Sequence, residues 1–224
     1  MSRPCGLIVF DCDGTLVDSQ SAIVGAMTAA FTSCKRPPPS AEAVRRVIGL
    51  SLLRAMEVLV PHAGPGEHAA LDESYREHYA AQRAAGAHDD ALYPGTVAAL
   101  DALARDGWLL GIATGKSMRG LLATLERHGL RDRFLTLQTA DNCRGKPDPH
   151  MVENAMADAG ARPAETVVVG DTVFDIQMAR AAGATAFGVS WGYHPREELV
   201  AAGAHALLEH FDELASALAR RAGM

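Results

Sequence analysis

Four short clusters of polar residues could act together in catalysis, because each combines an acid, a hydroxyl or a lysine with glycine or proline. They are Asp11-Cys12-Asp13-Gly14-Thr15, Thr114-Gly115-Lys116-Ser117, Gly145-Lys146-Pro147-Asp148-Pro149 and Gly170-Asp171-Thr172-Val173-Phe174-Asp175. The first and last clusters supply four carboxylates, which would raise one another's pKa values unless a cation lay among them. Oxygen ligands of this kind suit Mg²⁺. Lys146 and Thr114 add donors for phosphoryl oxygens, so these residue types predict Mg²⁺-assisted phosphoryl transfer.

A parallel sheet is expected to position the clusters, because strands and helices alternate along most of the chain. Residues 6–10 form an apolar run, typical of a strand buried on both faces, which ends at Asp11. Further strands are expected at 109–113, 134–137, 166–169, 185–189 and 205–208, with helices at 96–106, 118–128, 150–159 and 173–182 between them and two more near the end. This order predicts an α/β fold with a doubly wound parallel sheet. Each cluster then falls at the carboxyl edge of that sheet, where ligands bind.

The segment from residue 16 to residue 90 interrupts this alternation and contains no convincing strand. Helices are expected at 19–33 and 66–85, with two shorter ones between 40 and 60 that break near Gly49. We therefore predict two domains: a catalytic core of residues 1–15 and 91–224, and a small all-helical cap domain of residues 16–90 inserted after the first strand.

The composition indicates which kinds of binding partner and which cellular location to expect. The net charge is −6, and no basic run interleaves with aromatic residues, so we expect no nucleic-acid partner. The four cysteines (Cys5, Cys12, Cys34 and Cys143) match no zinc or redox spacing and predict reduced thiols in a cytoplasmic protein. The apolar run at 6–10 is too short for a signal peptide or membrane span, so no membrane partner is expected.

The clusters resemble all four motifs of the haloacid dehalogenase superfamily. Residues 11–19, DCDGTLVDS, resemble its first motif; Thr114 resembles the second, Lys146 in GKPDP the third, and Gly170-Asp171 with Asp175 the fourth. The helical insert resembles the cap of the phosphoglycolate phosphatase-like branch, and the resemblance implies a Rossmann-like core. It also implies a phosphatase that acts on a small phosphorylated metabolite, with phosphoglycolate as a candidate substrate.

The resemblance implies a role for each matching residue on the reaction path. Asp11 is expected to attack phosphorus and form an aspartyl-phosphate. Asp13 is expected to protonate the leaving oxygen and then to activate water, since residues two apart on an extended chain face the same side. Thr114 and the Gly115 amide are expected to bind phosphoryl oxygens, and Lys146 to neutralise charge.

The same resemblance implies a Mg²⁺ site. Its ligands are expected to be the carboxylate of Asp11, the backbone carbonyl of Asp13 and the carboxylate of Asp171. Asp175 is expected to add a further carboxylate near the metal, although its position also suits a first-turn helix acid favoured by the helix dipole.

Several polar residues of the clusters have a structural interpretation beside the functional one. Ser117 and Asp148 are expected to cap the helices that follow them, and Cys12 is expected to face the core. Lys116 suits a solvated charge and an anion-steering role equally. Lys146 is less open to the structural interpretation, because prolines stiffen its loop and the chain has three lysines in all.

The cap is expected to select the substrate. The break at Gly49-Leu50-Ser51 should face the active site, and a neighbouring arginine such as Arg45, or else Arg46 or Arg54, is a candidate for binding a substrate carboxylate. The alternative is that these arginines cover a solvent face. His194 lies in the loop after the fifth expected core strand. It is a candidate for substrate contact, but an incidental loop position is the favoured interpretation.

Four other functions are alternatives to a phosphatase. A phosphomutase similar to β-phosphoglucomutase shares the nucleophile, the acid/base aspartate and such a cap. A receiver domain that accepts a phosphoryl group is usually half this length, and a non-catalytic binding protein would not need every catalytic residue type. Both a monomer and a homodimer are compatible with the sequence. A phosphonatase would need a lysine in the cap, where the chain has Lys35 beside a proline-rich turn.

Overall fold

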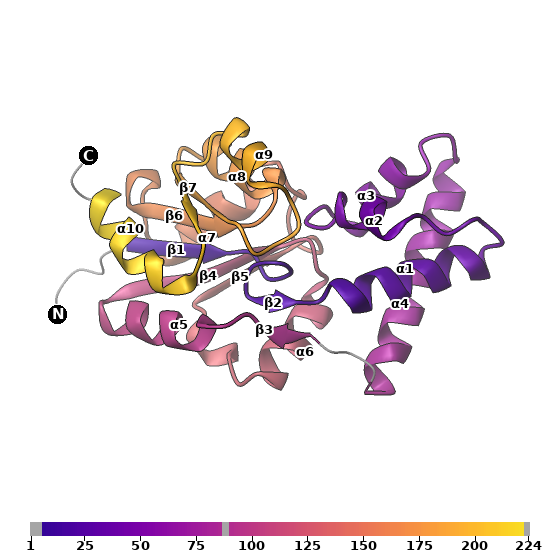
Figure 1. Ribbon diagram of the computed structural model, residues 1–224, viewed down its shortest axis with the longest axis horizontal. Helices are drawn as coiled ribbons and strands as arrows, with labels where there is room; N and C mark the ends of the chain where they lie inside the picture. Colours follow the sequence, from indigo (N-terminus) through magenta and orange to yellow (C-terminus); the bar gives the residue numbers. More distant parts are fainter. Residues whose placement is uncertain (1–5, 87–89, 222–224) are drawn as a thin grey trace.

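The computed structural model describes residues 6–86 and 90–221. Its core is a six-stranded parallel sheet with the order β5-β4-β1-β6-β7-β8 (Figure 1). The strands are β1 (Gly6–Phe10), β4 (Trp108–Thr114), β5 (Thr136–Thr139), β6 (Thr166–Gly170), β7 (Thr185–Val189) and β8 (Ala206–Leu208). The chain builds outward from β1 to β5 and then crosses back to β6 on the other side of β1. In sheets with such a reversal, ligands generally bind at the carboxyl ends of the strands beside it, here β1 and its neighbours.

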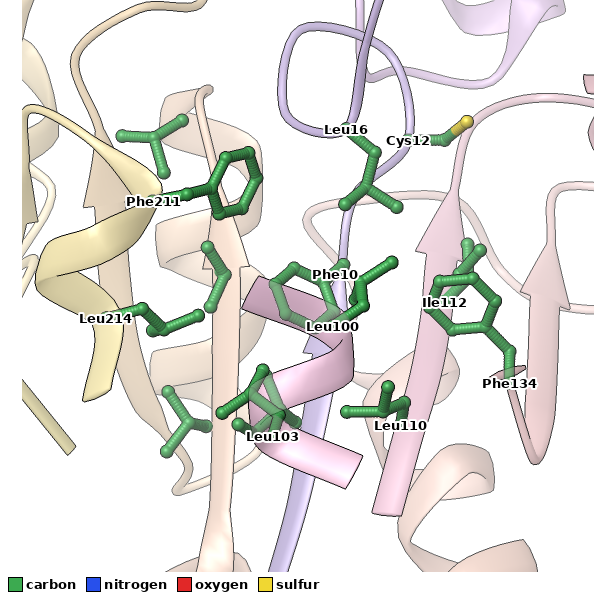
Figure 2. Close-up of a cluster of buried hydrophobic side chains, with 14 of the residues drawn as sticks. Phe10, Cys12, Leu16, Leu100, Leu103, Leu110, Ile112, Phe134, Phe211 and Leu214 are labelled. Atoms are coloured by element: carbon green, nitrogen blue, oxygen red, sulfur yellow. The ribbon is translucent and has the colours of Figure 1, made fainter. Parts of the chain in front are cut away.

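Helices cover both faces of the sheet, as the alternating sequence predicted. One face packs on α5 (Thr96–Arg105), α6 (Met118–Arg127) and α10 (Leu214–Arg221); the other packs on α7 (His150–Ala159), α8 (Val173–Ala181) and α9 (Arg196–Ala201). The five residues of β1 are all buried, with Ile8 and Phe10 facing the first layer and Leu7 and Val9 the second. Figure 2 shows Phe10 in the first layer, among Leu100, Leu110 and Ile112. Alternate residues of β1 thus pack into opposite apolar layers, and this burial fixes the strand that leads into Asp11.

In the described part of the cap there are four helices, and they lie beyond the carboxyl end of β1 (Figure 1). They are α1 (Gln20–Ser33), α2 (Ala41–Arg45), α3 (Leu52–Leu59) and α4 (Pro65–Ala84). The long helices α1 and α4 pack together, and the cap has its own apolar cluster around Met27, Phe31 and Met56. A separate core of this kind lets the cap keep its shape on the larger domain.

Two short strands join the cap to the core. Strands β2 (Val17–Asp18) and β3 (Ala91–Leu92) pair antiparallel where the chain leaves the core and where it returns. The sequence predicted no strand in residues 16–90, and β2 is a correction to that expectation. A strand of two residues shows no periodicity, so only the meeting of the two chain crossings defines it. Leu16 and Val17 also pack into the sheet's apolar layer.

The predicted doubly wound fold is confirmed, and the element boundaries differ by small amounts. Strand β5 begins at Thr136, two residues later than expected, because a 3-10 helix at Arg131–Arg133 precedes it. Phe134 lies between them and is buried in the core. In the part of the chain that the structure describes, no helix combines the length and apolar character needed to cross a membrane.

Candidate active site

The four polar clusters meet at the carboxyl edge of the sheet. Asp11 follows β1, Thr114 ends β4 and Asp171 follows β6, while Lys146 comes from the loop after β5. All four side chains are buried. Because β1 lies between β4 and β6 in a parallel sheet, residues more than a hundred positions apart in the chain become neighbours.

Lys146 bridges two carboxylates at the centre of this edge. Its Nζ lies 2.8 Å from Asp11 Oδ1 and 2.6 Å from Asp175 Oδ1. Burial by itself would lower the pKa of Lys146, but the charges of Asp11 and Asp175 outweigh it and raise that pKa above its usual value. The lysine is therefore a fixed positive charge beside Asp11.

Asp11 has one oxygen free for a ligand. Its Oδ2 is buried, and within residues 6–86 and 90–221 no hydrogen bond or ion pair reaches it. Burial raises the pKa of Asp11 to about 7, with Asp175 adding to the rise and Lys146 opposing it. A buried carboxylate oxygen without a partner is costly unless it binds something, so this atom is suited to a metal ion or to a phosphorus atom.

The neighbouring carboxylates fit a small hard cation. Oxygens of Asp11, Asp171 and Asp175 lie within 4.8 Å of one another. Burial and the charge of Asp11 raise the pKa of Asp171 well above its usual value. Because a bound cation would relieve this repulsion, the donor set fits Mg²⁺, which prefers carboxylate oxygens and keeps positions for water and phosphate.

Asp171 is held from two sides. Thr15 Oγ1 donates to its Oδ1 at 2.8 Å, and the Tyr193 amide donates to its Oδ2 at 2.9 Å. Gly14 and Gly192 let two loops approach this closely, since a Cβ at either position would lie less than 3 Å from Asp171 side-chain atoms. The turn at Gly14 also has a φ of +86°, which favours glycine. Tyr193 was not predicted to hold this residue.

Asp175 has the first-turn helix position that the sequence allowed, and its carboxylate also lies in the cluster with Asp11 and Asp171. It lies in the first turn of α8 and forms a capping box with Thr172, whose Oγ1 donates to Asp175 Oδ2 at 2.6 Å. Its other oxygen pairs with Lys146. Both oxygens of Asp175 are thus engaged, and within the carboxylate cluster this residue holds the lysine in place.

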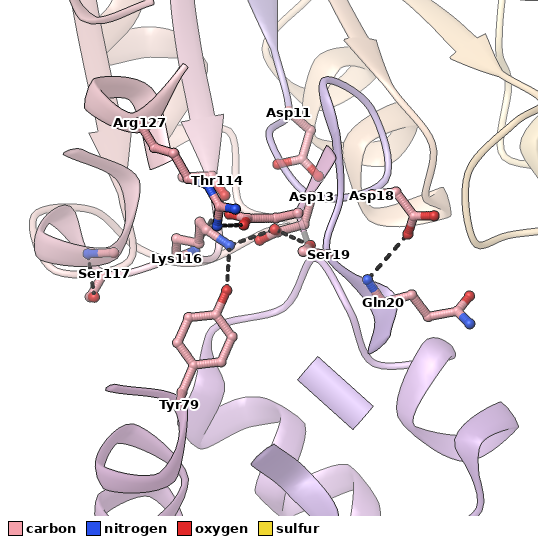
Figure 3. A network of polar contacts seen from close by, with 12 residues as sticks. Asp11, Asp13, Asp18, Ser19, Gln20, Tyr79, Thr114, Lys116, Ser117 and Arg127 are labelled. Atoms are coloured by element: carbon pink, nitrogen blue, oxygen red, sulfur yellow. Dashed lines mark hydrogen bonds and ion pairs between the residues drawn. The ribbon is translucent and has the colours of Figure 1, made fainter. Parts of the chain in front are cut away.

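Asp13 forms a second polar centre, shown in Figure 3. Ser19 Oγ donates to Asp13 Oδ1, and Lys116 Nζ pairs with the same oxygen at 2.5 Å. Lys116 also donates to the hydroxyl of Tyr79, on cap helix α4, at 3.3 Å. The sequence did not predict that Ser19, Lys116 and Tyr79 meet at Asp13. Ser19 lies within the recognised first motif, but Tyr79 carries no local signal.

A cavity of about 680 Å³ separates the cap from this edge of the core. Asp11, Asp13, Thr114 and Gly115 line it on the core side; Gly49, Leu50, Ser51, Tyr75 and Tyr79 are among the cap residues that do so. The loop at Gly49 touches the core closely, because a Cβ on Gly115 would lie 2.4 Å from the Leu50 carbonyl oxygen. The structure therefore places the break in the cap against the loop that follows β4, on the cavity, as expected.

The structure does not bring the three suggested cap arginines to this cavity. Arg45 donates to the Ala41 carbonyl of its own helix at 3.3 Å. Arg46 pairs with Glu198 of the core, and Arg54 pairs with Glu57. These side chains lie on faces of α2 and α3 that point elsewhere, which the short helices' sequence does not reveal. Among the residues that the structure describes, the arginines that line the cavity are Arg76, Arg83 and Arg119.

His194 packs against the first residues of α8. It is buried, its Nδ1 accepts from the Val173 amide at 3.2 Å, and its ring meets Phe174 edge-on at 5.4 Å. Burial, with the charge of Arg46, lowers its pKa. His194 is not among the residues that line the cavity. It thus supports the first turn of α8, which carries Asp175.

Three smaller expectations concern Ser117, Asp148 and Cys12, and the structure differs from them only in the position of Asp148. Ser117 caps α6 by accepting from the Gly120 amide at 3.2 Å. Asp148 accepts from the His150 amide at 3.0 Å, although Pro149 occupies the N-cap position of α7. Cys12 is buried in the apolar layer.

The structure thus combines a doubly wound core, buried carboxylates and a lysine at its carboxyl edge, and a helical cap that faces them across a cavity. The sequence profile of the haloacid dehalogenase-like hydrolases matches residues 8–189. The chain belongs to this family, in its phosphoglycolate phosphatase-like branch of phosphatases.

Relatives match nearly the whole chain. It is 36% identical to "Probable phosphatase IndB" of Dickeya dadantii, over 94% of this chain and 92% of that protein. It is 32% identical to the phosphoglycolate phosphatase of Rhodospirillum rubrum, over 92% of this chain and 88% of that protein. The crystal structure of a hydrolase from Pseudomonas syringae superposes with a TM-score of 0.85, at 27% identity, over 96% and 98% of the two chains. Both the cap and the core are thus within the similarity.

Proposed function

We propose that this phosphatase is Mg²⁺-dependent and hydrolyses a small phosphomonoester through an aspartyl-phosphate on Asp11. The observation that carries the proposal is the state of the Asp11 carboxylate. One of its oxygens pairs with Lys146, and the other is buried without a partner among the described residues, while the side chain lines the cavity. A nucleophile held in this way is oriented before the substrate arrives.

In the first step, an Asp11 oxygen attacks phosphorus and the bond from phosphorus to the leaving oxygen breaks. Asp13 donates a proton to the leaving oxygen, so an alcohol departs. Lys146, the hydroxyl of Thr114 and the amide of Gly115 stabilise the charge on the transferring group. Mg²⁺ held by Asp11, Asp171 and the Asp13 carbonyl would neutralise phosphoryl oxygens. Asp175 keeps Lys146 directed at Asp11.

In the second step, Asp13 takes a proton from a water molecule whose oxygen attacks the same phosphorus. The bond between phosphorus and the Asp11 oxygen breaks, which releases phosphate and restores the carboxylate. Asp13 returns the proton to the next leaving group, so one residue serves both steps. Its placement two residues after Asp11, on the cavity wall, suits both transfers.

The size and lining of the cavity bear on the substrate. Phosphoglycolate is the substrate that the name of one relative suggests. A cavity of about 680 Å³ also admits a larger leaving group, since pockets of about 300–1,000 Å³ hold drug-sized ligands. Its cap side is largely apolar, with Ile23, Met27 and Val44 among its residues. We therefore propose a phosphomonoester of sugar-phosphate size or smaller.

Phosphate release across a panel of phosphomonoesters tests this proposal. The panel includes phosphoglycolate, sugar phosphates, nucleotides and pyrophosphate, each with Mg²⁺ and with EDTA, and with Asp11→Asn protein as the control. We expect release that needs Mg²⁺ and disappears in the variant. If no compound of the panel released phosphate, the result would contradict the proposed hydrolysis. Transfer from a sugar bisphosphate to a sugar phosphate would instead favour the phosphomutase alternative.

A further inference from the structure

Lys116 joins the cap to the proposed acid/base residue. Its Nζ contacts Asp13 Oδ1 and the Tyr79 hydroxyl, and it lies 5.5 Å from the centre of the Tyr79 ring (Figure 3). The side chains of Lys116 and Asp13 are 8% and 10% exposed. Water therefore competes little with this ion pair, unlike that of a solvated surface lysine. A loop of the core and a helix of the cap thus meet at one carboxylate.

The two oxygens of Asp13 have different surroundings. Oδ1 accepts from both Lys116 and Ser19, whereas across the described ranges no hydrogen bond or ion pair reaches Oδ2. Asp13 also lines the cavity. The terminal torsion of an aspartate is broad when nothing holds it, and charge-assisted hydrogen bonds to one oxygen restrict it. Oδ2 is therefore the oxygen presented for proton exchange.

The cap supplies the other end of this contact. Tyr79 lies on α4 and stacks on Tyr75, with ring centroids 5.6 Å apart and planes at 21°. Tyr75 in turn packs against the apolar cluster of the cap. Because these residues move with the cap, tilting the cap away from the core would separate Tyr79 from Lys116. The placement of Lys116 on Asp13 is thereby tied to the position of the cap.

We propose that Lys116 is a positioning residue through which the cap, when it lies on the core, orients the Asp13 carboxylate for proton transfer. This inference rests on the proposed phosphatase function. Lys116 itself neither attacks phosphorus nor exchanges a proton. As the proton passes from Asp13 Oδ2 to the leaving oxygen and the P–O bond breaks, Asp13 becomes negatively charged beside a fixed ammonium group, which favours the transfer.

A series of substituted phenyl phosphates tests this role, because its members share a shape and differ in the acidity of the leaving phenol. Less acidic phenols depend more on protonation by Asp13. For Lys116→Met, kcat/KM should fall roughly 10- to 100-fold for the least acidic phenol and much less for the nitrophenyl ester. The dependence of kcat/KM on leaving-group pKa should therefore become steeper.

Matched variants separate this role from others. Tyr79→Phe should steepen the same dependence to a smaller extent, because it removes the hydroxyl that Lys116 contacts and keeps the ring. Lys116→Arg, which retains the charge, should lie between Lys116→Met and the wild type. Lys35→Met makes the same change at an exposed lysine of the cap and should match the wild type.

The alternatives give different results. An equal fall in kcat/KM for every ester, or a change in KM alone, would mean that Lys116 binds substrate or maintains structure, and would overturn the inference. Since Lys116→Met leaves a buried carboxylate without its partner, it can fail to fold; a folded Tyr79→Phe protein with an unchanged dependence then overturns the inference equally. A wild type that releases no phosphate with Mg²⁺ overturns the proposed function itself.

Discussion

Lys146 Nζ lies 2.6 Å from Asp175 Oδ1, although the lysine belongs to the loop after β5 and the aspartate to the helix after β6. Both side chains are 0% exposed. The same ammonium group reaches Asp11 at 2.8 Å. A single buried cation therefore compensates two of the carboxylates at this edge, which orients Asp11 and keeps the cluster from repelling itself apart.

Lys146→Ala should reduce kcat by about 10²–10³-fold, because it removes a fixed positive charge from the site where negative charge develops. The measurement is phosphate release at saturating Mg²⁺ with the best substrate of the panel. Lys35→Ala, at an exposed position, serves as the control and should leave kcat unchanged. A loss of kcat smaller than tenfold would mean that Lys146 is not part of the catalytic centre.

Asp11→Asn should abolish turnover and keep the fold. The amide has nearly the shape of the carboxylate but is a very poor nucleophile. The substitution also removes a buried carboxyl group whose pKa is raised to about 7. Because a buried charge is costly, the metal-free variant should melt at the same temperature as the wild type or higher. Phosphate release and thermal unfolding in EDTA measure the two effects, and surviving turnover would refute Asp11 as nucleophile.

The metal-free protein should lose stability as the pH rises from about 4 to about 7. Burial raises the pKa of Asp11 from 3.8 to about 7, so the folded protein binds this proton more tightly than the unfolded chain does. Its contribution to stability is complete below the unfolded pKa and is lost as pH rises through the folded pKa. Denaturant unfolding in EDTA should show a loss on the order of a few kcal/mol.

Asp11→Asn is the control for this pH dependence, because the amide does not titrate. The difference in unfolding free energy between wild type and variant should shrink toward low pH. Adding Mg²⁺ should restore the stability of the wild type at pH 7, since a ligand that binds only the folded state stabilises it. Parallel profiles for the two proteins in EDTA would contradict a raised pKa at Asp11.

Gly115→Ala should impair catalysis through the contact between the cap and the core. An added Cβ would lie 2.4 Å from the Leu50 carbonyl oxygen and 2.9 Å from that of Gly49, so the cap loop or the loop after β4 must shift. A shift of about 1 Å can cost roughly 100-fold in rate. The values of kcat and KM measure it, and Gly66→Ala, where a Cβ meets nothing within 4 Å, is the matched control.

Arg83→Ala and Arg119→Ala should each raise KM several-fold for an anionic substrate, with little effect on kcat. Both arginines line the cavity, and among residues 6–86 and 90–221 neither has an ion-pair partner. Arg45→Ala should leave KM unchanged, because Arg45 does not line the cavity. A rise of KM in Arg45→Ala alone would restore the original expectation for that residue.

The parallel core could be predicted because its signals are local. The five apolar residues of β1, the alternation of strands with helices and the polar residue after each strand all lie within short windows of sequence. Once the sheet is parallel, its geometry brings the strand ends together, so Asp11, Thr114 and Asp171 were expected at one edge before any distance was known. The boundaries of β5 shifted because a 3-10 turn carries little periodic signal.

The contacts between the cap and the core could not be predicted in this way. Whether Arg45 or Arg83 faces the cavity depends on how the cap helices rotate and where the cap lies, which is decided by packing rather than by the spacing of residues. The same holds for Tyr79, which reaches Lys116 from 37 residues away.

The sequence by itself determined the class of fold and brought the polar residues together at the strand ends, because both depend on local patterns. Its resemblance to family motifs then supplied the candidates for nucleophile and metal ligands and the lysine expected beside them. Only the tertiary structure decided that Lys146 is shared by Asp11 and Asp175 and that Lys116 links Asp13 to the cap. Such pairings depend on side chains from separate elements meeting within about 3 Å, and the docking of whole helices and loops sets distances of that size.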